Sequence, residues 1–132
     1  MMTLKPLLAC FLFAASGATF AKAPDCMDSA TTQLDMNTCA ASKSVKSDAQ
    51  LNRTYRDLLG RLDATSATRL REAQRRWVAW RDAQCAFEVG GVSGGSVAPM
   101  VQAQCVDQLT QAQTRLLDKH LHCEEGDVSC AK

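Results

Sequence analysis

Seven cysteines in a chain of 132 residues constrain the fold more than any other feature of this sequence. The first, Cys10, lies in an apolar N-terminal stretch, and the other six follow it. An even number of cysteines in an exported chain of this size predicts a framework of disulfides, which supplements a small hydrophobic core. The six cysteines expected to pair are Cys26, Cys39, Cys85, Cys105, Cys123 and Cys130.

The N-terminal stretch itself indicates export. Residues 1–21 combine a positive end at Lys5, an apolar middle and a small-x-small sequence ending at Ala21, a pattern typical of a cleaved secretory signal peptide. No later stretch approaches the roughly 20 apolar residues of a membrane-spanning helix. The sequence therefore predicts a periplasmic or secreted protein that has no transmembrane anchor and loses Cys10 on maturation.

The remaining chain, 22–132, has the size of one domain. Loss of Lys5 takes the formal net charge from +1 to about 0, so no overall electrostatic attraction to nucleic acid or anionic lipid is expected. The short interval between Cys123 and Cys130 suits a local disulfide. We therefore predict a single domain with a disulfide-closed C-terminal tail and no nucleic-acid partner, while the oligomeric state is not indicated.

Apolar residues recur at helical spacing along most of this domain, and glycine, proline and capping residues separate the helical stretches. The expected elements are a helix over 28–41, a weak point at 42–44, a helical stretch with its apolar face at 51–62, a turn and a new N-cap at 60–66, a helix to about 87, a glycine-rich loop at 89–96, and a last helix from 99 to about 122. The predicted fold class is all-α, a small antiparallel domain of three to four helices stapled by disulfides.

The middle of the chain is expected to form an antiparallel hairpin that turns near residue 64, so that facing positions sum to about 128. Leu51 then lies opposite Trp77. The carboxylate of Asp48 meets the guanidinium of Arg81 across the hairpin in the same register. This arrangement predicts an ion pair near the edge of the core.

Two disulfide pairings remain open for the four cysteines that the hairpin gathers at one end of the bundle. In the first, Cys39 pairs with Cys85 and Cys26 with Cys105. This pairing requires a bend at 42–44, because Cys39 and Cys85 miss the hairpin register by about one helical turn. In the second, Cys26 pairs with Cys39 and Cys85 with Cys105. We favour the first pairing.

Two spaced motifs occur in the helical segments. Their residues are Asp48, Leu51, Asn52 and Tyr55 in the first, and Gln74, Trp77, Trp80, Arg81, Asp82 and Cys85 in the second. Together with the Gly-Gly-Ser loop and Cys105 that follow, they make the chain resemble the LprI-type lysozyme-inhibitor family of bacterial exported proteins, from residue 26 to about 121. That resemblance implies a helical, cysteine-linked domain and, for the named members of the family, inhibition of lysozyme.

We interpret the motif residues as structural rather than as contacts with a target. The apolar members expected in the core are Leu51, Tyr55, Trp77 and Trp80, because an aromatic stripe at helical spacing packs a small bundle. The polar members expected to link helices are Asn52, Gln74 and Asp82.

No constellation in the sequence suits catalysis. A hydrolase needs an activated nucleophile, a carboxylate pair across a cleft or an open metal site, and none occurs with suitable spacing. The only histidines are His120 and His122, which point in different directions on a helix, and oxidised Cys123 cannot bind a metal beside them. We therefore expect a binding protein, not an enzyme, with no catalytic residue, cofactor or metal site.

The glycine-rich segment is the candidate contact surface. Blocking the carboxylate-lined cleft of a muramidase favours a projecting loop on a rigid scaffold, and glycines permit close backbone approach. The residues proposed for target binding are Glu88, Ser93, Gly94 and Ser96.

An alternative keeps the scaffold but changes the partner. An envelope interaction protein or a toxin-neutralising protein would use the basic helix face instead, whose residues are Arg69, Arg71, Arg75 and Arg76. The sequence leaves both surfaces open, and it does not specify a class of lysozyme.

Overall fold

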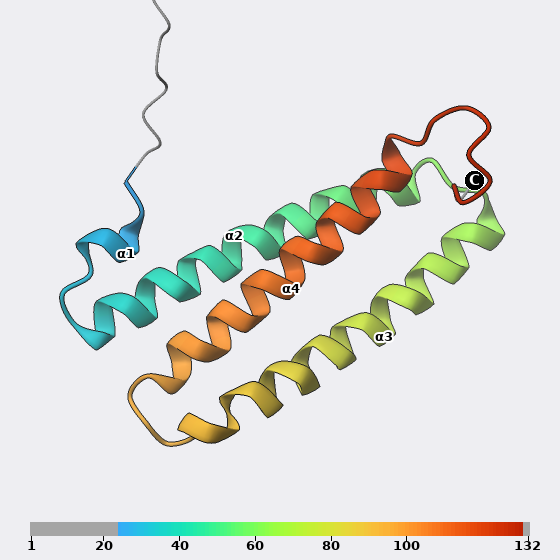
Figure 1. Cartoon of the computed structure of the whole chain (residues 1–132). Coiled ribbons are helices and arrows are strands. Elements are labelled where there is room, and N and C mark those ends of the chain that lie inside the picture. The colour runs from blue at the N-terminus through green and yellow to red at the C-terminus, as the bar shows by residue number, and fades with distance from the viewer. Residues whose placement is uncertain (1–23, 131–132) are drawn as a thin grey trace, which may run out of the picture.

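The computed structural model describes residues 24–130, so the expected signal peptide at 1–21 lies outside the described residues. The described chain consists of α1 (Cys26–Ser29), α2 (Gln33–Leu59), α3 (Ala64–Val89), the short 3-10 helix η1 (Gly90–Val92) and α4 (Ala98–Leu121). The helices α2 and α4 run side by side in the same direction, and α3 runs antiparallel to both (Figure 1). The described part contains helices and no strand, which confirms the all-α fold class.

Local chemistry sets the ends of the long helices. A capping box of Thr32 and Asp35 starts α2, and Gly60 caps its end. The carboxylate of Asp63 then caps α3 by accepting the backbone N–H of Ser66 at 2.8 Å, and this hydrogen bond lowers the pKa of Asp63. These boundaries agree with the predicted turn and N-cap at 60–66.

The weak point predicted at 42–44 is absent, because α2 continues without interruption from Gln33 to Leu59. Serine disfavours a helix only slightly, and the helix can retain its own hydrogen bonds around it. The hydroxyl of Ser47 donates to the carbonyl of Ser44 at 3.0 Å within the helix. The helix therefore stays straight enough to keep its N-terminal half beside α4.

The core lies along the contact between α2 and α4. Leu51, Leu58 and Leu117 are buried in it, and Tyr55 and Trp77 pack against them. Trp77 thus contacts the core cluster that contains Leu51, the residue that the hairpin register places opposite it.

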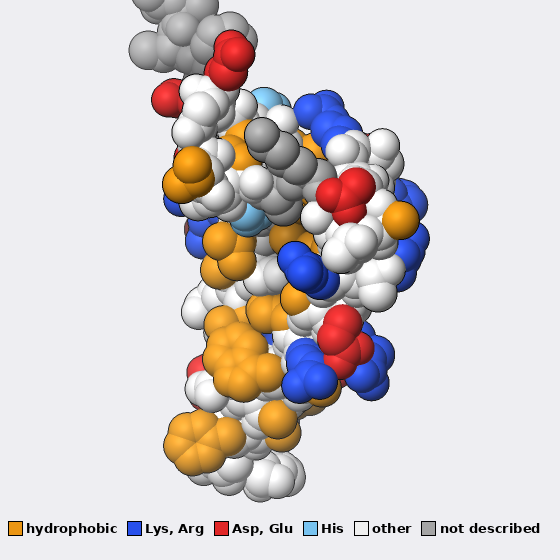
Figure 2. All heavy atoms as spheres, turned by 90° about the vertical axis from the view of Figure 1, so that its right-hand side faces the viewer, with side chains coloured by type: hydrophobic (Ala, Val, Ile, Leu, Met, Phe, Trp, Pro, Cys, Tyr) orange, Lys and Arg blue, Asp and Glu red, His pale blue; other side chains and the backbone are white. Residues whose placement is uncertain are grey.

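Trp80 does not lie in the core, where the sequence predicts it, because 52% of its surface is exposed. Three residues along a helix turn the side chain by about 300°, so Trp80 lies about 60° around α3 from Trp77 and misses the packed face. Phe87, seven residues further along the same stripe, is 79% exposed. Hydrophobic side chains accordingly gather at the surface beside charged ones in the lower half of Figure 2.

Arg81 joins the three long helices. Its side chain is only 12% exposed, and its Nη1 atom lies 3.3 Å from Oδ1 of Asp48 on α2 and 3.2 Å from Oγ1 of Thr110 on α4. The guanidinium carbon lies 5.2 Å from the centroid of the Trp77 ring, within cation–π range. Thr110 is completely buried, so this contact satisfies a hydroxyl that has no access to water.

Of the other polar motif residues, one links two helices and two make contacts within their own helix. The amide of Gln113 on α4 donates to Gln74 on α3 at 3.0 Å and so links two helices. Asn52 instead donates to Asp48 within α2 at 3.1 Å, and the carboxylate of Asp82 pairs with the neighbouring guanidinium on α3 at 2.9 Å. Asn52 and Asp82 are exposed and do not bridge helices through these bonds.

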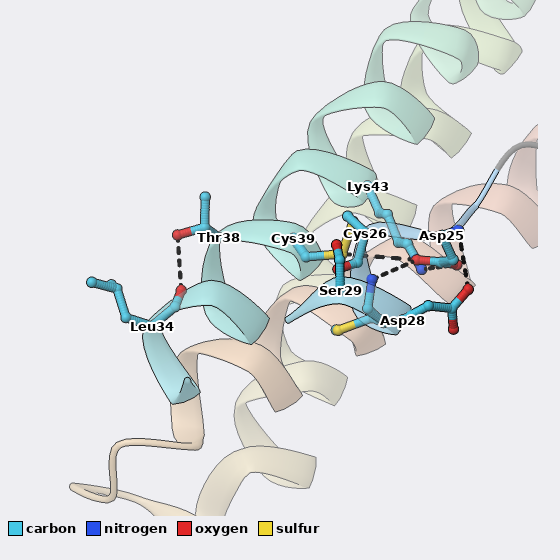
Figure 3. The surroundings of a disulfide bond; sticks show 9 residues. Asp25, Cys26, Asp28, Ser29, Leu34, Thr38, Cys39 and Lys43 are labelled. Carbon is cyan, nitrogen blue, oxygen red and sulfur yellow. Dashed lines mark hydrogen bonds and ion pairs between the residues drawn. A yellow bond between two sulfur atoms is a disulfide. The ribbon is translucent and has the colours of Figure 1, made fainter. Parts of the chain in front are cut away.

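The disulfides follow the second of the two pairings, so the pairing that we favoured is wrong. The bonded cysteines are Cys26 with Cys39, Cys85 with Cys105, and Cys123 with Cys130. Because α2 has no bend at 42–44, Cys39 does not reach Cys85. The short helix α1 folds back beside the start of α2 and brings Cys26 to Cys39, next to an ion pair between Asp25 and Lys43 (Figure 3).

Replacing Arg81 with alanine should lower the free energy of unfolding by about 2 to 3 kcal/mol, because a charged hydrogen bond is lost and the buried hydroxyl of Thr110 is stranded. Asp48 is half exposed, so Asp48→Ala should cost only about 1 kcal/mol. Urea unfolding with the disulfides intact measures both values. The exposed Arg71→Ala is the control, and a loss as large as that of Arg81→Ala would contradict the prediction.

Candidate functional site

The segment between α3 and α4 is a series of tight turns. The backbone N–H of Ser93 donates to the carbonyl of Gly90 at 3.4 Å, and that of Gly95 donates to Val92 at 3.0 Å. A third bond joins the N–H of Ala98 to the carbonyl of Gly95 at 3.1 Å. The segment predicted as a flexible loop is therefore a compact turn structure that contains η1.

Two glycines are required by the shape of this loop. Gly94 has a φ of +80°, in the left-handed region that glycine adopts at little cost. A Cβ atom on Gly95 would lie 3.1 Å from the carbonyl oxygen of Val92, which is a tight contact with backbone. By contrast, a Cβ atom on Gly90 or Gly91 would meet nothing within 4 Å.

The base of the loop is held from all three long helices. The disulfide between Cys85 and Cys105 joins the end of α3 to the start of α4, with a Cα–Cα distance of 5.6 Å. From α2, the side-chain amide of Asn37 donates to the backbone carbonyl of Ser96 at 3.0 Å. Sequence reasoning missed Asn37, since no motif or periodicity distinguishes it from the other polar residues of its helix.

The structure brings the four proposed target-binding residues together at this end of the bundle. Ser93, Gly94 and Ser96 are exposed, and neither serine hydroxyl has a hydrogen-bond partner among residues 24–130. Glu88 lies on the last turn of α3, where its carboxylate accepts a hydrogen bond from Gln84 at 2.9 Å. The site thus offers two hydroxyl groups, one carboxylate and an accessible backbone.

Neither histidine of the chain lies near the exposed serines of the loop. Both histidines, His120 and His122, lie at the C-terminal end of α4, whereas the loop precedes its N-terminal end. A helix of this length separates its two ends by roughly 35 Å. Ser93 and Ser96 therefore have no imidazole base nearby, and their hydroxyl groups are available for hydrogen bonds.

A second cluster contains groups of the kinds that bind metal ions, but its role is structural. One ligand atom from each of Asp25, Cys26 and Cys39 lies within 4.8 Å of the others. The two cysteines are bonded to each other, so neither offers a thiolate to a metal ion. Asp25 caps α1 and pairs with Lys43, which fastens α1 to α2 (Figure 3).

The basic face of α3 is less positive than its arginine count indicates. Arg75 and Arg76 both pair with Glu72, at 2.8 and 2.6 Å. Both contacts lower the pKa of Glu72, and the hydrogen bond with Arg76 has the larger effect. Arg69 and Arg71 are exposed on the same helix. The alternative contact surface therefore rests mainly on these two arginines.

The fold and this site define a class of protein: a small helical domain, linked by disulfides, that presents an ordered loop at one end. The family profile described as lysozyme inhibitor LprI matches residues 26–117, and the chain belongs to this family. The family is one of inhibitors, not of enzymes. None of the described helices is both long and apolar enough to span a membrane.

A relative from Rhizobium meliloti (strain 1021), an uncharacterized protein, is 35% identical to this chain over 116 residues. The match covers 78% of this chain and 83% of the relative, so the likeness extends over most of both proteins. No solved structure matches the chain.

Replacing Gly94 with alanine should lower the free energy of unfolding by about 1 to 2 kcal/mol, because a Cβ atom disfavours the left-handed backbone. Gly91→Ala is a matched control in the same loop, where a Cβ atom has open space. Urea denaturation compares the two variants. Equal stabilities would show that the loop does not hold the conformation described.

Proposed function

We propose that this protein is exported and inhibits a lysozyme by placing the loop 88–98 in the sugar-binding cleft of the enzyme. The family description supports a lysozyme as the target, and the pattern of residues 1–21 supports a periplasmic or secreted location. The observation that carries the proposal is a braced loop whose two exposed hydroxyl groups have no partner among the described residues.

The chemistry of the loop suits a muramidase cleft. Glycoside hydrolases of this kind cleave their substrate with a pair of carboxyl groups, and an ionised carboxylate accepts hydrogen bonds. The hydroxyl groups of Ser93 and Ser96 can donate such bonds. Gly94 carries no side chain, so the backbone can approach the cleft floor closely.

The braces of the loop reduce the cost of binding. A flexible loop loses conformational entropy when a partner orders it, and this loss weakens the complex. Here the turns, the Cys85–Cys105 disulfide and the bond from Asn37 hold the loop in one shape before contact. We therefore attribute affinity to shape and hydrogen bonds rather than to charge, since the mature chain is near neutral.

A second candidate function uses the side of the bundle. Exposed aromatic and arginine side chains are enriched where proteins bind one another, and α3 carries four that are exposed, Arg69, Arg71, Trp80 and Phe87. Such a surface would suit an envelope protein or a toxin that is not a lysozyme. This alternative keeps the fold and moves the contact away from the loop.

Titration of the oxidised protein against c-type, g-type and i-type lysozymes should show saturable inhibition of one class, with direct binding of matching affinity. The double variant Ser93→Ala/Ser96→Ala should then bind at least about tenfold more weakly, because two hydrogen bonds to charged groups are lost. The matched control is Arg69→Ala/Arg71→Ala, which should leave inhibition within about twofold. Loss of binding in the arginine variant alone would favour the alternative surface.

A further inference from the structure

A cavity of about 1100 Å³ lies at the opposite end of the bundle from the loop, between the first half of α3 and the second half of α4. Its apolar walls are formed mainly by Leu58, Leu62, Leu70, Leu116 and Leu117. The tail that follows α4, which the Cys123–Cys130 disulfide closes into a loop, also lines the cavity.

This cavity is open to solvent and has the volume of a ligand pocket, since pockets of several hundred Å³ take small ligands. The cavity exists because α4 packs closely against α2 and much less extensively against α3. Leu116, on the wall, is 52% exposed as a result.

The apolar surface continues beyond the cavity along α3. Ser66 and Ala73 line the cavity, and Trp80 and Phe87 follow at the same spacing of seven residues. Residues seven apart lie on one stripe of a helix. Both aromatic side chains are exposed, so an elongated apolar track leads from the cavity toward the other end of the molecule. Its shape suits a long chain better than a compact ring.

We propose that this cavity binds the acyl chain of a single-chain amphiphile whose head group carries both charges, as a lysophospholipid does. An extended peptide would bury backbone N–H and C=O groups, which need partners. Two of the polar wall residues are already engaged, because Gln113 donates to Gln74 and Ser66 donates to Asp63. A hydrocarbon chain needs no such partners and gains from burial against leucine.

The charged groups at the cavity favour a zwitterionic head group. Arg69 can pair with a phosphate, while the carboxylates of Glu124 and Glu125 can pair with an ammonium. Neither glutamate has an ion-pair partner within residues 24–130. The acids lining the cavity outnumber Arg69 and His120, so the carboxylate of a free fatty acid would be repelled.

Isothermal titration of the oxidised protein, purified from the periplasm and freed of lipid, tests this site. The probe is lysophosphatidylethanolamine with a 14-carbon chain, kept below its critical micelle concentration. We expect saturable binding of one molecule per chain, and binding of myristate at least about fivefold weaker because of the excess of carboxylates.

Filling the cavity with a larger side chain should weaken this binding. Leu116→Trp places a large side chain at the wall of the cavity and should weaken binding at least about tenfold, since excluding two or three methylene groups suffices for that. The matched control is Val45→Trp on the exposed face of α2, outside the cavity, which should bind within about twofold of the original protein. Circular dichroism must show equal helicity in both variants.

Three results would overturn the proposal. Binding that does not saturate would indicate unspecific partition. Equal affinities of the two tryptophan variants would place the ligand elsewhere, and myristate binding as tight as that of the lysophospholipid would refute the assigned head group. None of these outcomes depends on lysozyme, so the experiment tests the lipid site independently of the proposed inhibition.

Discussion

The contact of Arg81 with its partners is the interaction on which the arrangement of the bundle depends. The helix α3 packs only lightly on its neighbours, and this guanidinium reaches α2 through Asp48 and α4 through the buried hydroxyl of Thr110. It therefore fixes the register of α3 against both other long helices at a single point. The disulfide at Cys85, one helical turn further along α3, fixes the same end covalently. Toward the other end of α3, the leucine-lined cavity lies between α3 and α4.

Much of the fold follows from short-range chemistry and was predictable for that reason. The helix α2 ends at Gly60, and the side chain of Asp63 begins the next helix by capping it. The pair of Asp48 and Arg81 follows from counting residues back from that turn. The disulfide pairing was not predictable, because it depends on whether α2 bends at 42–44, and serine tolerates either geometry. Trp80 was misplaced because about 60° of rotation separates the packed face of α3 from its exposed flank.

The residues of the candidate site could be predicted from the sequence, but most of the contacts that brace the loop could not. Glycine and serine residues identify a loop, but its braces come from distant parts of the chain. Asn37 bonds to Ser96 across 59 positions, and nothing local marks either residue for that contact. The turn bonds among Gly90, Val92 and Gly95 likewise appear only in three dimensions. The leucines of the cavity resemble core residues in sequence, because the pattern of a helix face does not reveal how closely the facing helix approaches.

The disulfides pair the cysteines of the described chain consecutively, the first with the second, the third with the fourth and the fifth with the sixth, at separations of 13, 20 and 7 residues. A chain that crosses a membrane N-terminus first releases its cysteines in that same order. An oxidase that joins each newly exposed cysteine to the one before it would therefore make the native bonds directly. Such a topology needs no later exchange of partners, and each covalent loop is complete before the next cysteine pair arrives.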